Sequence, residues 1–338
     1  MKKFLSRILA LGILLTIVGA IVFAIGFSIS GFNFSKMSSI STVDNSYKEG
    51  ANAQVDNIEI IFNTSDIAVI FDENATEISI AYQTLESKNN KALTEVSVTA
   101  EAGKLTLEER TKNKLYLFPI QPNSKATVTI PASREITLAV SVDTGDITIA
   151  GNATLKNLKI ESDTGDIYAT DAVIKSLADM SFETNTGKIK LGKFDTDTFS
   201  IEGHTGNVSI VDGIVAGKAE IELSTGDLTV ISSLAAKTVE IEASTGDVLF
   251  KGNVKTESLL LDTSTGEIES DGAVIDAEEI TIETSTADVE LTLKGKLSDY
   301  TVLVEQSTGE SNITNRTGGS RTLNINVSTG DIEIEFKE

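Results

Sequence analysis

The sequence predicts an all-β fold: a parallel β-solenoid (β-helix) of about 20-residue coils, preceded by one N-terminal transmembrane helix. Three observations carry this prediction. A Thr-Gly step recurs at a nearly fixed spacing, apolar residues alternate at period two on both sides of it, and a long uncharged stretch follows a basic N-terminus. Alternation at period two is typical of strands that bury one face.

The repeat is the strongest of these signals. Its clearest copies read Ser-Thr-Gly-Asp, and consecutive copies lie 19 to 22 residues apart. The residues at the glycine position are Gly145, Gly165, Gly187, Gly206, Gly226, Gly246, Gly266, Ala287, Gly309 and Gly330. Repeats of this length indicate coils that stack on one another, because one such unit cannot bury its apolar face alone.

Each coil offers two strands and a third inward contact. In the coil around Gly246, Val239 and Ile241 alternate before the glycine and Val248 and Phe250 after it. We expect the glycine to take a positive φ in a type II turn. An antiparallel meander would also place glycine between strands. The solenoid is favoured because the same inward positions recur in register in every copy, which stacking about 4.8 Å apart requires.

Composition narrows the function. The chain has 338 residues and a formal net charge of -22, with 40% hydrophobic residues, 5% aromatic residues and no cysteine. A phosphate backbone is bound by Lys and Arg, so the acidic balance argues against nucleic acid as a partner. Without cysteine there is neither a disulfide framework nor thiolate chemistry. Stability must come from packing and backbone pairing.

The N-terminal segment reads as a membrane anchor. Lys2, Lys3 and Arg7 precede residues 8–35, which carry no charge. About 20 apolar residues suffice to cross a bilayer, and basic residues before the span place the N-terminus in the cytoplasm. We therefore expect a single-pass protein of the cell membrane with its C-terminal domain outside the cell. A cleaved signal peptide is the alternative, although no good Ala-x-Ala site follows Ala20.

The domain organisation follows from these patterns. Residues 1–36 form the cytoplasmic tip and anchor, and residues 37–50 form a polar linker. Residues 51–135 carry the repeat in degraded form, and we expect irregular coils that cap one end of the stack. Residues 136–338 form the regular solenoid. Because Ile332 to Phe336 follow the last turn directly, we expect no separate cap there and an unpaired edge that invites end-to-end self-association.

One stretch resembles a bacterial family. It reads Ala126-Thr127-Val128-Thr129-Ile130-Pro131 and is followed by the repeated Thr-Gly-Asp turns. Together they resemble the DUF4097 family of β-strand-repeat proteins, often described as candidate adhesins. The resemblance implies a cell-surface β-solenoid behind one N-terminal span, in some members within envelope-stress systems, and no established catalytic residues. This sequence departs from the pattern at Lys188, Asn207 and Ala287, where we expect local distortion.

Two acidic columns emerge when the coils are aligned on the glycine, and both point outward by the alternation. The column four residues before it contains Glu161, Glu183, Glu202, Glu222, Glu242, Asp262, Glu283 and Glu305. The column one residue after it contains Asp146, Asp166, Asp227, Asp247, Glu267, Asp288, Glu310 and Asp331. Like charges 4.8 Å apart repel by roughly 0.9 kcal/mol in water.

These columns have a plain and a functional interpretation. They can be a solvated face with turn caps that also blocks aggregation of a long β structure. Alternatively, they gather a basic protein or peptide of the cell envelope, or weakly held Ca²⁺. Calcium needs six to eight oxygen ligands, so one column forms no closed site. We expect no resident cofactor or metal.

The sequence therefore predicts a non-catalytic binding, adhesion or envelope-associated scaffold module at the cell surface. The alternatives are an enzyme that acts on polysaccharides and a self-assembling structural scaffold. Solenoid enzymes that cleave polysaccharides need acids and basic residues grouped at the centre of one face. Here the acids run evenly along the stack and the basic residues are scattered.

Overall fold

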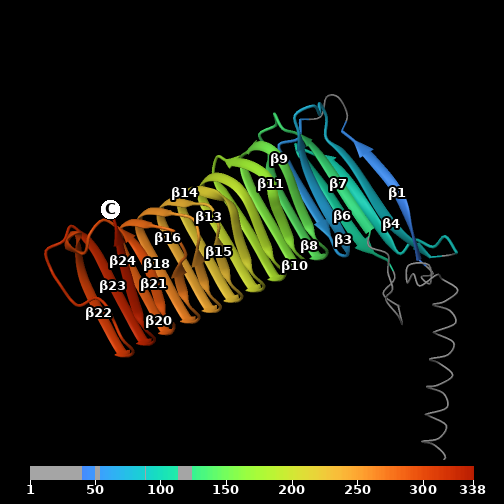
Figure 1. Cartoon of the computed structure of the whole chain (residues 1–338). Helices are drawn as coiled ribbons and strands as arrows, with labels where there is room; N and C mark the ends of the chain where they lie inside the picture. The colour runs from blue at the N-terminus through green and yellow to red at the C-terminus, as the bar shows by residue number, and fades with distance from the viewer. Residues whose placement is uncertain (1–39, 50–53, 88, 113–123) are drawn as a thin grey trace, which may run out of the picture.

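The computed structural model describes residues 40–49, 54–87, 89–112 and 124–338. Figure 1 shows a rod of stacked strands, with the strands that come first in the chain at one end and the C-terminus near the other. The predicted anchor, residues 1–36, lies outside the described residues. Within those residues, no helix has the length and apolar character needed to cross a membrane.

One side of the rod is a parallel sheet, here called the first ladder. Its strands before residue 187 are β2 (Asn57–Phe62), β6 (Lys104–Thr111), β8 (Thr137–Thr144), β10 (Asn157–Thr164) and β12 (Asp179–Thr186). Its later strands are β16 (Leu234–Thr245), β18 (Val254–Thr265), β20 (Ile275–Thr286), β22 (Tyr300–Thr308) and β23 (Arg321–Thr329).

The second ladder lies across the core and is also parallel. Its strands are β3 (Ser65–Asp72), β7 (Ser124–Pro131), β9 (Ile147–Leu155), β11 (Ile167–Ser176), β15 (Leu228–Val230), β17 (Val248–Phe250), β19 (Ile268–Ser270), β21 (Val289–Lys294) and β24 (Ile332–Lys337). Two long strands, β13 (Ile189–Thr205) and β14 (Val208–Thr225), run through both ladders. The stretch between the second-ladder and first-ladder segments of each regular coil forms a short third side, for example residues 211–217 of β14. The predicted parallel solenoid is confirmed, and the meander is wrong for the repeats.

The corner glycine joins the two ladders. Gly246 has φ +133°, which lies beyond the value of about +80° of a type II turn, so the chain bends into the next strand without reversing. A Cβ on Gly246 would lie 2.1 Å from the carbonyl oxygen of Gly226 in the preceding coil. Stacking continues where glycine is replaced, because the Ala287 N–H still donates to Thr329 O at 3.1 Å.

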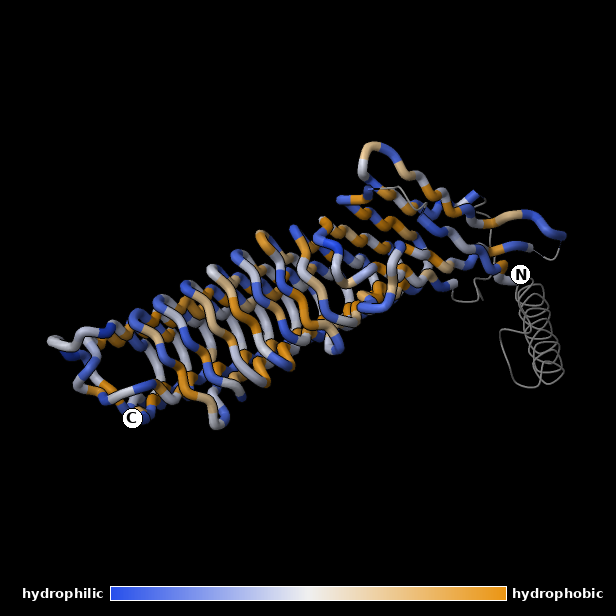
Figure 2. The backbone as a smooth tube through the Cα atoms, turned by 90° about the horizontal axis from the view of Figure 1, so that it is seen from above, coloured by the Kyte–Doolittle hydropathy of each residue, from blue (hydrophilic) through white to orange (hydrophobic). Residues whose placement is uncertain are grey.

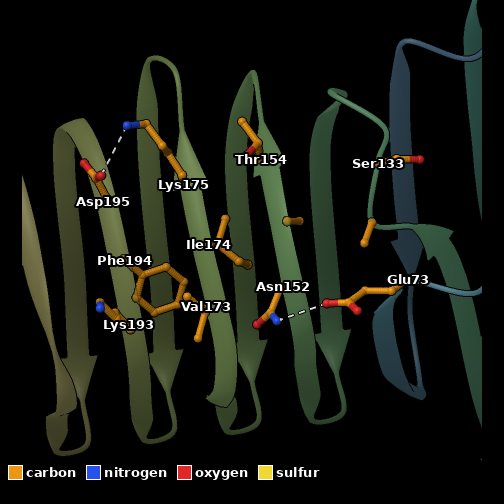
Figure 3. A pocket seen from close by; sticks show the side chains of 12 residues that line it. Glu73, Ser133, Asn152, Thr154, Val173, Ile174, Lys175, Lys193, Phe194 and Asp195 are labelled. Carbon is orange, nitrogen blue, oxygen red and sulfur yellow. Dashed lines mark hydrogen bonds and ion pairs between the residues drawn. The ribbon is translucent and has the colours of Figure 1, made fainter.

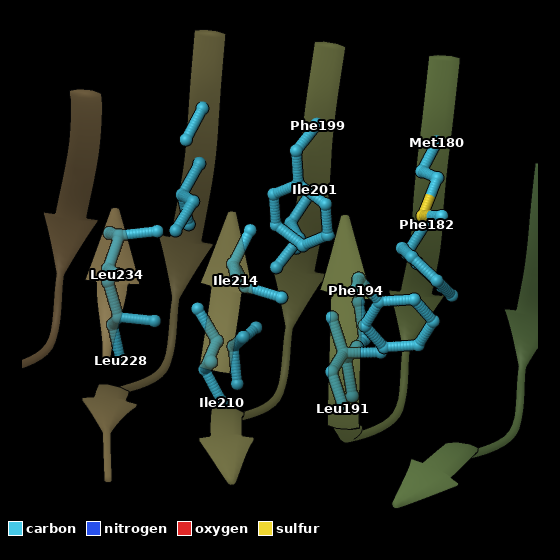
Figure 4. Close-up of a cluster of buried hydrophobic side chains, with 14 of the residues drawn as sticks. Met180, Phe182, Leu191, Phe194, Phe199, Ile201, Ile210, Ile214, Leu228 and Leu234 are labelled. Atoms are coloured by element: carbon cyan, nitrogen blue, oxygen red, sulfur yellow. The ribbon is translucent and has the colours of Figure 1, made fainter. Parts of the chain in front are cut away.

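Apolar and polar residues alternate along the chain, as the colours of the backbone tube in Figure 2 show. The apolar side chains fill the interior. Among the described residues, Phe182, Phe194 and Phe199 form an aromatic group, drawn in Figure 4. The ring centroid of Phe182 lies 5.4 Å from that of Phe194 and 6.1 Å from that of Phe199. Rings of adjacent coils therefore pack on one another along the rod axis.

The N-terminal end departs from the regular coil and contains antiparallel pairs. Here β4 (Ser79–Ser87) pairs with β7, β1 (Ile40–Lys48) pairs with β4, and β5 (Thr94–Glu101) pairs with β6. The strand β1 differs from the polar linker expected over residues 37–50. Its nine residues pair with β4 along their whole length, and Tyr47 packs against the core, so backbone pairing orders a polar segment.

The C-terminal end also differs from the expectation. The coil that comes last in the sequence is not the last in the stack, because β23 lies between β20 and β22. The connection to β22 contains the 3₁₀ turn η2 (Leu297–Asp299). Val302 and Arg316 exchange backbone hydrogen bonds of 2.9 Å across the outer edge of β22. The edge is thus partly covered, and the absence of a cap that the sequence suggested is wrong.

Candidate functional site

The column four residues before the corner glycine forms a continuous line of carboxylates on the outer face of the first ladder. Seven acids on seven neighbouring strands are register partners without a gap. They are Glu161, Glu183, Glu202, Glu222, Glu242, Asp262 and Glu283, and we call them the carboxylate column. Glu161 and Glu183 are half-buried and the others are exposed. The predicted outward orientation is confirmed.

The eighth acid of this predicted column is set apart. Because β23 is inserted between β20 and β22, Glu283 is paired with Asn326, and Asn326 with Glu305. An amide therefore separates Glu305 from the carboxylate column. The sequence could not show this, because the spacing of the repeats places Glu305 next to Glu283.

Stacking the acids changes their titration. The pKa of Glu183 is raised, first by burial and then by repulsion from Glu161 and Glu202. The pKa of Glu242 is raised by burial, then by Glu222 and its other acidic neighbours. Such shifts mean that a positive charge placed along the column would relieve repulsion at several carboxylates together.

Few cations balance the column from within the chain. Lys159 pairs with Glu161, and this contact raises the pKa of the lysine. His204 Nε2 lies 4.0 Å from Glu202 Oε1 and carries charge only when protonated. Among the described residues, no ion pair reaches Glu222, Glu242 or Glu283. These three carboxylates therefore face solvent without an ion-pair partner from the described residues.

The structure adds residues that the sequence reasoning missed. Glu220 and Glu240 lie two residues before Glu222 and Glu242 on the same outer face, and they are register partners. Lys218 Nζ lies 3.0 Å from Glu220 Oε1 and 3.6 Å from Glu240 Oε2. Period-two spacing from the column would have found them. They widen the acidic surface in the middle of the rod.

The column one residue after the glycine has a different role, which the hydrogen bonds define. In most coils the side-chain Oδ1 at this position accepts the backbone N–H of the same position in the next coil. The accepting residues, which we call the corner column, are Asp66, Asp146, Asp166, Asn207, Asp227, Asp247, Asp288 and Asp331. Their donor–acceptor distances run from 2.7 to 3.2 Å.

The corner column therefore supports the corner turns of the solenoid. Asp227 accepts from the N–H of Asp247, and Asp247 accepts from the N–H of Glu267 at 2.8 Å. Glu267 ends this run as a donor only, and its pKa is raised by burial and then by Glu269 and Asp247. Of the predicted site residues, Asp227 and Asp247 thus have one oxygen engaged by the backbone.

Next to Asp166, the corner carries a tyrosine on the same coil and two lysines, Lys188 and Lys190, on the next coil. The hydroxyl of Tyr168 donates to Asp166 and raises the pKa of the tyrosine to about 12. Burial would raise the pKa of Asp166, but the hydrogen bonds from Tyr168 and from the N–H of Lys188 outweigh it, and the pKa is lowered. The Lys190 ammonium lies 6.0 Å from the Tyr168 ring centroid.

A shallow cavity of about 530 Å³ lies on the third side, away from both columns. Figure 3 shows its lining, in which Lys175 pairs with Asp195 at 3.3 Å and Asn152 donates to Glu73 at 3.4 Å. Lys175, Asp195 and Glu73 are thus each engaged with a neighbouring group of the lining. In the part of the chain that the structure describes, no three acidic or histidine side chains converge as they would around a metal ion.

The sequence matches a family model and is similar to several solved structures. The family model described as Toastrack DUF4097 matches residues 55–230 and 216–338. No curated protein matches the chain. Among solved structures, the chain is similar to a proposed cell adhesion protein of Clostridium sporogenes. The two share 11% identity over 88% of this chain and 100% of that one, with a TM-score of 0.33.

Two further solved structures are similar. A proposed adhesin of Bacteroides fragilis shares 16% identity over 87% of this chain and 97% of that one, with a TM-score of 0.38. A proposed lipid-binding protein of Parabacteroides distasonis shares 14% identity over 89% of this chain and 98% of that one, with a TM-score of 0.27. The two matched ranges overlap and together cover residues 55–338, and the protein is a member of the Toastrack DUF4097 family.

Proposed function

We propose that this protein is a membrane-anchored, extracytoplasmic solenoid that binds cationic partners along its carboxylate column without catalysing a reaction. The observation that carries the proposal is the unbroken register of seven acids from Glu161 to Glu283. Their backbones repeat about every 4.8 Å in a parallel sheet. An extended basic peptide or protein segment of the cell envelope laid along the rod axis would meet several carboxylates at once.

Electrostatics favours this class of partner. The chain carries a net charge of -22. Among the described residues, no cation forms an ion pair with Glu222, Glu242 or Glu283 of the carboxylate column. Such a surface raises the local concentration of basic molecules and speeds their encounter with the rod. Because the carboxylates are mostly exposed, each contact is weak, and affinity depends on several contacts made together.

The binding test uses the full-length chain in detergent micelles and a fluorescent oligolysine peptide. We expect binding that weakens steeply with salt. Replacing Glu222, Glu242 and Glu283 with glutamine should weaken it by about tenfold or more. The matched control replaces three exposed acids of the third side, Asp171, Asp197 and Asp212, with asparagine. An equal loss in both variants would mean that only net charge matters and would reject the column as the site.

Calcium is the second ligand class for the same column. The stacked carboxylates supply oxygens but no closed cage, so the expected binding is weak and spread over the column. Millimolar Ca²⁺ should then compete with the peptide more strongly than an equal ionic strength of Na⁺. If the two salts displace the peptide equally, the column screens charge without binding calcium.

The location of the rod is part of the proposal. The strand β1 begins at Ile40, shortly after the uncharged residues 8–35, so the anchor would join the N-terminal end of the rod and leave the opposite tip free. The chain has no cysteine, so a Thr229→Cys variant carries a unique label site. A membrane-impermeant maleimide should label it on intact cells. Labelling only after lysis would refute the extracytoplasmic orientation.

A further inference from the structure

The free tip of the rod is closed by a coil taken out of sequence order. Thr329 of β23 is the register partner of Thr286 in β20 on one side and of Thr308 in β22 on the other. The chain therefore passes from β21 to the outermost strand β22 and returns to fill the space left behind it. In Figure 1, β22 lies at the tip, beyond β23.

The strands β22 and β23 carry nearly the same pattern. Val302 and Val304 of β22 stand beside Leu323 and Ile325 of β23. Each strand ends in Ser-Thr, which is followed by glycine and an acid. Either strand could therefore pair with β20 in the same register. The inserted order is one of two arrangements that the strand pattern permits.

Specific contacts hold the inserted order. Arg321, the first residue of β23, lies with its guanidinium 3.0 Å from Asp276 Oδ1 and 3.3 Å from the hydroxyl of Tyr300. The Gly295 N–H donates to Lys337 O at 2.7 Å, which ties β24 to the connection that crosses it. These contacts lie at the two ends of residues 321–338 and would be released together if that segment left.

The outer edge of β22 does not offer simple strand addition. Val302 and Arg316 exchange backbone hydrogen bonds across it, and the Val304 N–H donates to Asn315 Oδ1 at 2.6 Å. A second rod therefore finds the outermost strand partly occupied. Self-association at this tip requires exchange of an internal strand instead of edge pairing.

The link between the outer edge and the inserted strand is short and rich in glycine. Residues 317–320 read Thr-Gly-Gly-Ser, and Gly318 has φ +105° with open space around it. Four residues span at most about 14 Å when extended. The inserted strand lies one strand spacing, about 4.8 Å, behind β22. The link starts at the tip surface. It could therefore reach the space between β20 and β22 of a second rod that is placed tip to tip with the first.

We propose that residues 321–338 are exchanged between two copies of this chain, which joins two rods tip to tip. Each copy places its β23 between β20 and β22 of the other. The exchange reproduces every strand pair of the single chain, so it costs little pairing energy, as in other domain swaps. The partner is a second copy of this chain, and its docking surface is the space between β20 and β22.

The test uses full-length single-cysteine variants, because the natural chain has no cysteine. Glu283 and Asn326 are exposed register partners on β20 and β23. Glu283→Cys and Asn326→Cys chains are mixed, unfolded, refolded together and oxidised. Exchange should give a disulfide-linked species of twice the 35.9 kDa chain mass. The control mixture is Glu222→Cys with Glu242→Cys, exposed register partners in the middle of the rod.

We expect the tip mixture to give at least about tenfold more of this species than the mid-rod mixture, because exchange holds the two thiols at strand spacing. Equal yields would overturn the proposal. The second measurement uses one chain with both tip cysteines, oxidised as a monomer. This locked chain should stay monomeric in light scattering and recover dimers after reduction and refolding. Dimers that form equally in the locked chain would also overturn it.

Discussion

The backbone N–H of Asp227 donates to the side-chain Oδ1 of Asn207 at 3.2 Å, so an amide here does what a carboxylate does elsewhere in the corner column. The Asn207 side-chain amide in turn donates to Asp227 Oδ2 at 3.0 Å. Each position of the corner column therefore requires a side-chain oxygen within hydrogen-bond distance of the backbone N–H in the next coil. It does not require a negative charge.

A pair of substitutions at Asp247 tests this requirement. Asp247→Asn keeps an Oδ1 for the N–H of Glu267 and removes one charge, so we expect stability close to that of the natural chain. Asp247→Ala removes the acceptor and should cost about 0.5–1.5 kcal/mol. Urea unfolding followed by circular dichroism measures both. Equal destabilisation by the two variants would show that the charge, and not the acceptor, supports the corner.

Gly246 should tolerate no side chain, unlike the corner position of Ala287, where φ is not positive. Gly246→Ala would place a Cβ 2.1 Å from the Gly226 carbonyl oxygen at φ +133°. The coils would have to separate there, and we expect a loss of more than about 3 kcal/mol or failure to fold. Gly272→Ala is the control, since its φ is +76° but no atom lies within 4 Å of the added Cβ. It should cost only about 1 kcal/mol.

Burial, followed by repulsion within the carboxylate column, should make stability depend on pH. The pKa of Glu242 is raised in the folded chain, so the folded state holds more protons than the unfolded state between the two pKa values. Stability therefore falls as pH rises through that window. Glu242→Gln should stabilise the chain by roughly 0.2–1 kcal/mol at neutral pH.

The pH profile distinguishes this effect from a change in packing. The gain of Glu242→Gln should vanish below about pH 4, where the glutamate is protonated in both states. Asp212→Asn changes the same charge at an exposed position on the third side and provides the control. Thermal unfolding from pH 3 to pH 8 measures both variants. A gain that persists at the acid end would contradict the electrostatic account.

The aromatic group in the core should be the most sensitive packing site. Phe194 is fully buried against Phe182, and Phe194→Ala should cost about 3–5 kcal/mol. Phe194→Leu fills most of the space and should cost less. Val215→Ala changes an exposed side chain of a neighbouring coil and should have little effect. Denaturant unfolding of the three variants gives the order, and a Val215→Ala loss equal to that of Phe194→Ala would contradict it.

Much of the fold could be predicted because the pattern of buried apolar residues repeats about every 20 residues along the chain. Inward positions such as Val239 and Ile241 recur in every coil, and only parallel stacking brings all of them into one core. The carboxylate column followed from the same alignment. Glu220 and Glu240 beside it were missed because their position is acidic in only these two of the regular coils and forms no repeating pattern.

The ends were not predictable from the repeat. β22 and β23 carry the same pattern, and the contact that favours the inserted order, Arg321 with Asp276, joins residues 45 positions apart in the sequence. The strand β1 has little apolar alternation, so its pairing with β4 depends on backbone groups that the sequence pattern does not show. The hydrogen bonds of the corner column were hidden for the same reason, although Asn207 among the acids was a clue.

The closed tip also limits how such a rod can change its length. An extra coil added after β24 would meet an end already occupied by β22 and the segment that covers it. Between Gly206 and Gly266 the spacing is 20 residues at every step, and each coil contacts only similar neighbours. Tandem duplication of one such unit in the gene would lengthen the protein by one coil and leave both ends intact. Within one chain, a coil inserted between Gly206 and Gly266 would therefore fit the stack, whereas a coil added after β24 would not.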